Sequence, residues 1–135
     1  PRDGGADWDR RLGEVVEAHG VGDRRFWADG LTAARQDAMA AVTLEARVFA
    51  VAWLAWWCRL GVAAGHVPAA SARTTTAAAA SALRGRCHDW LGYGDAFVAE
   101  AAVRGSQRQR MALRADTRLL YRPGWPWADV AWPPP

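Results

Sequence analysis

The side chains that could perform catalysis are few, and their spacing matches no known catalytic arrangement. Ser71, Ser81 and Ser106 lie outside any strand–turn–helix nucleophile motif. His88 and Asp89 are sequence neighbours, but adjacent residues of a helix point in different directions, so a solvated edge explains them better than a catalytic pair. No group of Cys and His has metal-site spacing, and no Gly-rich loop is placed to hold a phosphate. We therefore predict a protein that is not an enzyme and that binds no metal and no cofactor.

The basic residues are the second group of side chains that could bind a ligand. All 17 basic residues are Arg, and the net charge is +3. Four of them recur at four-residue intervals near the C-terminus: Arg110, Arg114, Arg118 and Arg122. Together with Arg104 this row could follow nucleic-acid phosphates, although a solvated helix has the same pattern and no groove-reading motif accompanies it. A small nucleic-acid-binding or virion-associated protein is therefore the alternative function that the sequence leaves open.

The element that must position any site is the apolar stretch 44–64. Every residue of 48–58 is apolar, and three of them are Trp. A helix that is apolar all round is normally buried, and this run is shorter than the ~20 apolar residues of a membrane span. We predict a central helix wrapped by other helices, with Thr43 as its N-cap. A membrane-inserting hairpin with Pro68 in its turn is the alternative.

The remaining elements are divided by Gly and Pro. Apolar spacing predicts helices over 5–19, 32–42, 71–84, 96–103 and 106–121, with short helical segments at 23–30 and 87–91. We expect Gly92 and Gly94 to stop the second short segment and Asp95 to cap the helix that follows. The predicted fold is all-α, a compact bundle of about seven or eight helices in one domain over 1–122. The Pro-rich and Trp-rich residues 123–135 should form an extended tail whose three Trp lie over the domain surface.

The sequence WLGYGDAFVAEAA, which begins at Trp90, resembles the second homology motif of the Bcl (B-cell lymphoma) family of apoptosis regulators. In that motif a Trp opens a short helix, a Gly-containing turn follows, and a segment like DAFV begins the last helix of the domain. The interval from Trp to Asp is shorter here than in the family. The residues Arg47-Val48-Phe49-Ala50 are similar to the end of the first homology motif, without its preceding Asn-Trp-Gly, and Gly22-Asp23 is faintly similar to the third. The resemblance covers roughly 44–104.

The resemblance implies a Bcl-like fold, which agrees with the central helix inferred from periodicity. It also implies a physical rather than a catalytic activity, in which the amphipathic BH-three helix of a pro-apoptotic Bcl protein lies in a surface groove. Arg47 would pair with the Asp of that ligand at the edge of the groove. Five apolar residues would line the groove, two on the floor, one near an end and two in the wall: Val48, Val51, Phe97, Met39 and Val42.

Each assignment has a simpler alternative. Val51 and Phe97 can be ordinary core residues, and Arg47 can pair with an Asp or Glu of its own chain. The compact, divergent, Lys-free sequence resembles viral Bcl homologues, so we expect an inhibitor of apoptosis. Its partners would be host pro-apoptotic Bcl proteins, and it would act in the cytoplasm, including at the mitochondrial surface of a host cell. A homodimer held by exposed Trp, and membrane association through the full-length protein, are further possibilities.

Overall fold

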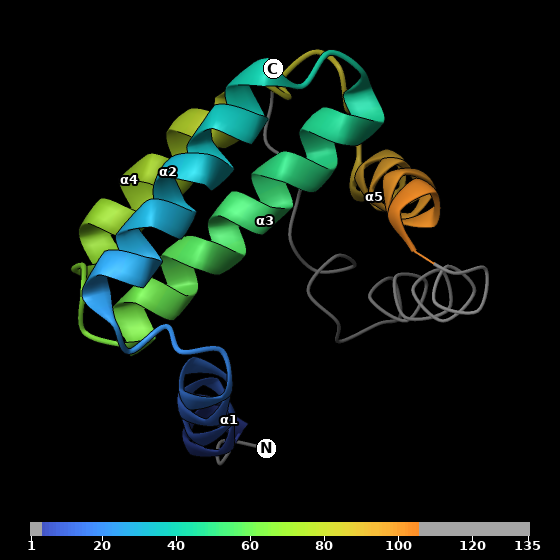
Figure 1. Ribbon diagram of the computed structural model, residues 1–135. Coiled ribbons are helices and arrows are strands. Elements are labelled where there is room, and N and C mark those ends of the chain that lie inside the picture. Colours follow the sequence, from blue (N-terminus) through green and yellow to red (C-terminus); the bar gives the residue numbers. More distant parts are fainter. Residues whose placement is uncertain (1–3, 106–135) are drawn as a thin grey trace. The chain divides into compact units, whose positions relative to one another are not determined.

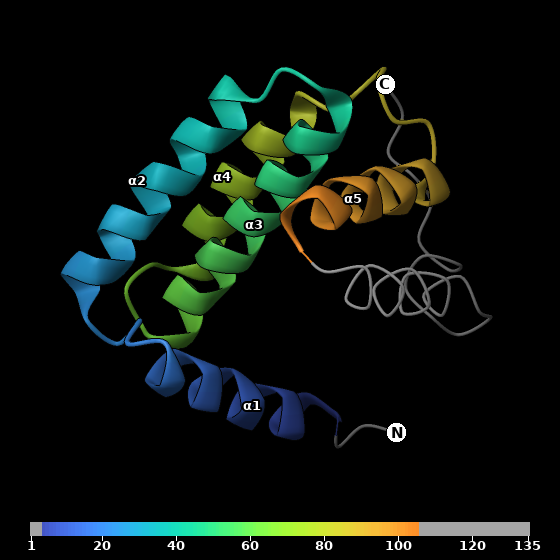
Figure 2. The same ribbon diagram turned by 45° about the vertical axis from the view of Figure 1, so that its right-hand side comes forward.

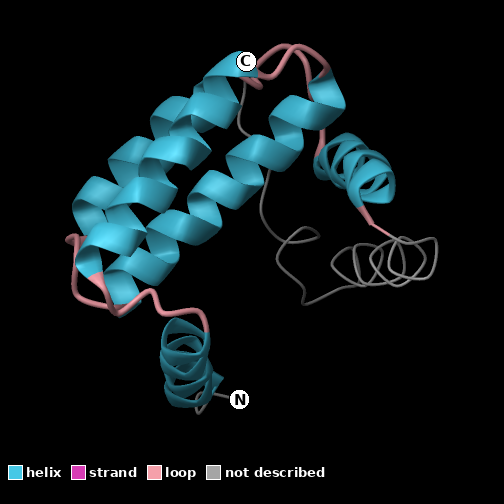
Figure 3. Cartoon of the chain, in the orientation of Figure 1, coloured by secondary structure: helices cyan, strands magenta, loops and turns pink. Residues whose placement is uncertain are grey.

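The computed structural model describes residues 4–105, which form five α-helices and no strand (Figures 1 and 3). Their bounds are α1 Gly4–Ala18, α2 Arg24–Ala40, α3 Leu44–Ala63, α4 Ala69–Ser81 and α5 Trp90–Arg104. The all-α prediction is therefore confirmed for this part of the chain, with fewer helices than we expected. The predicted helix 106–121 and the predicted tail 123–135 lie outside the described residues.

The helices belong to two compact units. Among the described residues, the first unit comprises 4–40 and 50–79, and the second unit comprises 41–49 and 80–105. The boundary falls within α3, whose first residues belong to the second unit and whose remaining residues belong to the first. The prediction of one domain over 1–122 stays a prediction, because residues 106–122 lie outside the described part of the chain.

The first difference from the predicted elements is that α2 is one helix where we expected two segments. Asp23 caps it, because the Asp23 carboxylate accepts a hydrogen bond from the backbone N–H of Phe26 at 2.9 Å. Gly30 lies within the helix, and the indole of Trp57 occupies the space where a Cβ of residue 30 would stand. Gly30 therefore serves close packing and does not end the helix.

The second difference concerns the stretch that carries the Bcl resemblance. Residues Trp90–Arg104 form one continuous helix, so Gly92 and Gly94 do not stop a short helix and the predicted turn is absent. The N-cap is Asp89, whose carboxylate accepts a hydrogen bond from the N–H of Gly92 at 2.6 Å, and our assignment of Asp95 as the cap was wrong. Gly94 is buried, which is a packing reason for a small residue within the helix.

Other helix ends follow the sequence more closely. Thr43 caps α3 as predicted, since its hydroxyl accepts a hydrogen bond from the N–H of Ala46 at 3.1 Å. Gly20 and Gly65 follow the ends of α1 and α3 with φ of 68° and 77°, a left-handed conformation that a side chain disfavours. At both ends paired backbone hydrogen bonds close a Schellman motif.

The core of the first unit lies between α2, α3 and α4, which run alongside one another in Figures 1 and 2. One buried cluster joins α1 to α2 and α3 through Leu12, Val16, Trp27 and Leu60, together with Val21 of the connecting loop. A second joins α2, α3 and α4: Ala34, Leu54, Cys58 and Ala72. Helix α3 therefore lies at the centre of this unit, as its apolar sequence predicted.

The prediction that α3 is covered on all sides is wrong, because four of its residues are exposed: Glu45, Trp53, Arg59 and Ala63. The largest apolar side chain among them is Trp53, which is 47% exposed. Among the described helices α3 alone is long and apolar enough to cross a membrane by length and composition. The core helix of a soluble protein meets the same criteria of length and composition.

Candidate functional site

Arg47 is the predicted site residue whose surroundings are most unusual. Its side chain lies in the first turns of α3, where the guanidinium nitrogen Nη2 donates a hydrogen bond to the carbonyl oxygen of Ala41 at 2.9 Å. Its Nε–H is buried and has no hydrogen-bond partner in the described residues. Between residues 4 and 105 no Asp or Glu forms an ion pair with it. The alternative of a pair with a carboxylate of its own chain is therefore not realised in the described part.

The hydrogen bonds and the charge of the Arg47 guanidinium are only partly balanced by the rest of the described chain. A guanidinium carries five N–H donors and a full charge, and a neutral carbonyl satisfies one donor without balancing the charge. A buried donor without a partner costs about 1–3 kcal/mol, and more in a charged group. Arg47 also has a structural function, because its bond to Ala41 closes the loop 41–43 onto α3.

The two residues predicted for the groove wall are strongly exposed. Met39, in the last turn of α2, is 84% exposed, and Val42, in the loop that follows, is 83% exposed. Met39 belongs to the first unit and Val42 to the second. Each offers an apolar side chain that the described chain leaves largely in water, whereas most apolar side chains of this size are buried.

The two residues predicted for the groove floor are buried. Val48 is 0% exposed and Val51 is 4% exposed. Both are core side chains here, which is the alternative that we had kept for Val51. A ligand could touch either residue only after the side chains over it had moved.

Phe97 forms part of an aromatic cluster in the second unit. Its ring stacks on Phe49 with the centroids 5.2 Å apart and the planes 17° from parallel. The guanidinium carbon of Arg104 lies 4.5 Å from the centroid of the Phe49 ring, a cation–π contact, and its Nε pairs with Glu100 at 3.1 Å. Phe49 and Arg47 are two positions apart on α3, which corresponds to about 200° around the helix axis. Phe97 therefore does not lie on the side of α3 that carries Arg47.

This aromatic cluster was not predicted from the sequence. The four-residue spacing of Glu100 and Arg104 was a visible signal, because residues at i and i+4 share a helix face. The pairing also bears on the nucleic-acid alternative, since Arg104 is already occupied by Glu100 and Phe49. The other Arg residues of the proposed phosphate-following row lie outside the described residues.

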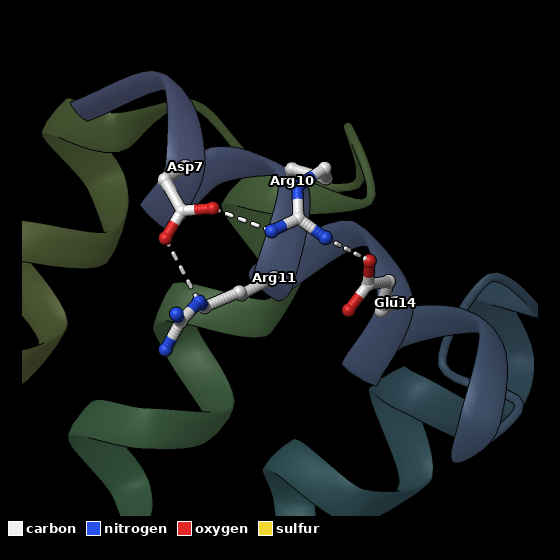
Figure 4. A network of polar contacts seen from close by, with 4 residues as sticks. All are labelled: Asp7, Arg10, Arg11 and Glu14. Carbon is white, nitrogen blue, oxygen red and sulfur yellow. Dashed lines mark hydrogen bonds and ion pairs between the residues drawn. The ribbon is translucent and has the colours of Figure 1, made fainter. Parts of the chain in front are cut away.

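A second charged cluster lies on the surface of α1 and is shown in Figure 4. Arg10 contacts both Asp7 and Glu14, and Arg11 Nε lies 2.9 Å from Asp7 Oδ2. The hydrogen bond to Asp7 and the charge and hydrogen bond of Glu14 raise the pKa of Arg10. All four side chains are exposed and their charges cancel, so they form a solvated helix face without the free charge that a ligand would need.

The two cysteines and Asp89 could in principle act in catalysis or bind a metal, but each has a role in the folded structure instead. Cys58 and Cys87 are buried, and burial raises the pKa of both thiols, which disfavours the nucleophilic thiolate. Asp89 caps α5, as described above. Within residues 4–105 no three His, Cys, Asp or Glu side chains gather as metal ligands would.

Comparison with known proteins gives no relative for this chain. No protein-family model matches the sequence, and no curated protein and no solved structure matches it.

Proposed function

We propose that the protein is a non-catalytic regulator that binds an amphipathic helix bearing a carboxylate, with Arg47 as its polar anchor. The observation that supports this most is the half-buried Arg47 guanidinium, which has a neutral carbonyl partner and no carboxylate partner in the described residues. The resemblance to the Bcl family suggests the class of ligand. It would be the BH-three helix of a pro-apoptotic Bcl protein, and its sequestration would block cell death.

The electrostatic argument starts from the unbalanced charge. A ligand carboxylate that reached the N–H donors of Arg47 other than the buried Nε–H would form charge-assisted hydrogen bonds, which are roughly twice as strong as neutral ones. Because the Arg47 side chain is already held by Ala41, little side-chain entropy would be lost when the ligand binds. Such a contact would fix the register of the bound helix.

The apolar argument rests on Val42, which precedes Arg47 by five residues and lies in the loop that Arg47 closes. An amphipathic ligand helix places apolar side chains at i, i+3 and i+4 on one face, and Val42 offers an exposed surface for one of them. Val48, which belongs to the same unit, would contribute as supporting core, because it is buried. The proposed docking surface is therefore smaller than a groove that runs along α3.

The test is calorimetric titration of the protein with a panel of BH-three peptides. We expect at least one peptide to bind with a Kd of ~10 μM or tighter, which corresponds to about −7 kcal/mol. Arg47→Met should weaken this binding roughly tenfold to a hundredfold, and replacing the peptide's Asp by Asn should add little further loss in that variant. Circular dichroism should show that the helices of Arg47→Met are retained.

The matched control is Arg104→Met, since Arg104 is an exposed Arg of the same unit that already has a carboxylate partner. Its binding should equal that of the wild type. Absence of binding across the panel would refute the proposed function. Equal losses in the two Arg variants would show instead that binding depends on overall charge and not on Arg47.

A further inference from the structure

A second Arg whose charge is not balanced by an ion pair in the described residues is Arg35, in the first unit. Its side chain joins α2 to α4. Nη2 of Arg35 donates a hydrogen bond to the hydroxyl oxygen of Thr75 at 3.2 Å, and both groups are accessible to solvent. Arg35 forms no ion pair with any carboxylate of residues 4–105. The guanidinium of Arg35 thus contacts a hydroxyl group, and a hydroxyl can be modified covalently with an anionic group.

The surroundings of Thr75 favour an anion. Helix α4 has the sequence AASARTTTAAAAS, which contains no acidic residue and one further cation, Arg73. The field of Arg35 also reaches α3, because its charge opposes the rise in the pKa of the Cys58 thiol that burial causes. An added negative charge on Thr75 would therefore meet a cation on α2 and no carboxylate on its own helix.

Helix α4 is also the kind of segment that can open to admit a modifying enzyme. Three consecutive β-branched residues, Thr74 to Thr76, lower its helix propensity. Thr74 bonds back to the carbonyl of Ala70 at 3.1 Å, a contact that weakens helices slightly. The one buried residue of α4 is Ala72, so little apolar area holds the helix in place. Local opening is least costly where such contacts are few.

We propose that Thr75 is a phosphorylation site whose phosphate is received by Arg35. In the transfer, Thr75 Oγ1 forms a bond to the γ-phosphorus of a nucleoside triphosphate as the bond from that phosphorus to the β,γ-bridging oxygen breaks. The hydroxyl proton passes to a base of the modifying enzyme, and the nucleoside diphosphate leaves. The product is a phosphothreonine whose oxygens accept charge-assisted hydrogen bonds from Arg35.

The consequence is a closer connection between two helices of the first unit. A phosphate carries a charge of about −1.5 to −2 at neutral pH and can form one to three charge-assisted hydrogen bonds where it faces Arg. A neutral hydroxyl acceptor would thus be replaced by an anion at the same place. The modification should make α4 harder to open and should stabilise its packing on α2.

The first experiment compares Thr75→Glu with its neutral counterpart Thr75→Gln by thermal unfolding of the full chain. We expect the Glu variant to melt about 2–5 °C higher. The difference should vanish when both variants also carry Arg35→Met. The matched control pair is Thr74→Glu and Thr74→Gln, whose difference should not depend on Arg35. An advantage of Glu at position 75 that persists without Arg35 would overturn the proposal.

The second experiment remains informative if the Glu variants fold poorly. Phosphothreonine is installed at position 75 of the full chain by semisynthesis, and the phosphorus NMR shift is followed as pH changes. Pairing with Arg35 should lower the second pKa of the phosphate below its usual value near 6, and Arg35→Met should restore that value. A phosphate that titrates alike with and without Arg35 would refute the proposal.

Discussion

The replacement of Gly30 by Ala tests the packing of α2 on α3. The two helices are joined by a reciprocal contact, in which the Trp27 indole N–H donates to the carbonyl oxygen of Trp57 at 2.9 Å and the Trp57 indole N–H donates to the carbonyl oxygen of Trp27 at 2.7 Å. Each indole lies against a Gly of the opposite helix, Trp57 on Gly30 and Trp27 on Gly61. A Cβ at residue 30 would stand 2.2 Å from Cζ2 of Trp57.

The magnitude follows from three contributions. A rigid indole cannot avoid a carbon at that distance by a small rotation, so the overpacking should cost about 1–3 kcal/mol. Displacement of the Trp57 ring also breaks its N–H bond to Trp27, which should cost a further 0.5–1.5 kcal/mol or so. Ala gains about 0.5–1 kcal/mol over Gly within a helix. We therefore expect Gly30→Ala to lower the free energy of unfolding by about 0.5–4 kcal/mol, with a central value of about 2 kcal/mol.

The assay is urea unfolding followed by circular dichroism, with Gly13→Ala as the matched control. Gly13 lies within α1, and a Cβ there would meet nothing within 4 Å, so this variant should be stabilised by up to about 1 kcal/mol. In the double variant with Trp57→Leu, Gly30→Ala should lose most of its cost. If Gly30→Ala were as stable as Gly13→Ala, the close contact of Gly30 with Trp57 would not exist in solution.

Two further predictions concern α5. Asp89→Ala should lower the free energy of unfolding by about 1 kcal/mol in urea titrations, because it removes the acceptor for Gly92 N–H, whereas Asp89→Asn should retain most of that stability; equal losses would show that the cap is not formed. Burial, followed by the charge of Cys87, raises the pKa of Tyr93 to about 12. Because the folded state then holds this proton more tightly, its contribution is complete below pH ~10 and about 2–3 kcal/mol should be lost as pH rises to ~12. Tyr93→Phe should abolish that loss in urea titrations at each pH, and phenolate absorbance should follow the same range.

The apolar pattern was sufficient to predict the helical class and the position of α3. It did not predict every helix end correctly, because we placed helix ends at Gly residues on the basis of their low helix propensity. Gly30, Gly92 and Gly94 all lie within helices. At Gly30 the reason is tertiary, because the indole that needs the space comes from a residue 27 positions later in the chain. A propensity of about 1 kcal/mol against Gly is easily outweighed by a buried aromatic contact of this kind.

The N-cap of α5 shows how two local signals can compete. Asp89 and Asp95 were both acceptable caps by residue type, and we chose the later one because Gly92 and Gly94 seemed to end a helix before it. The structure contains the earlier cap, with Asp89 at φ −156° and ψ 170°. The motif that carries the Bcl resemblance thus has the expected residue types, but its Gly-containing turn is absent.

The candidate site shows what residue types alone could not provide, which is the direction of each side chain. Three consecutive residues have three different surroundings. Arg47 is partly exposed and donates a hydrogen bond to a backbone carbonyl, Val48 is in the core, and the ring of Phe49 stacks on Phe97. Successive positions turn by about 100° around a helix, so a motif read as a linear string necessarily distributes its residues over several faces. A ligand that approached the surface of the second unit would not meet Val48, because that side chain is fully buried. For this reason the carboxylate contact at Arg47, rather than the apolar floor of a groove, is the part of the proposal that mutagenesis should address first.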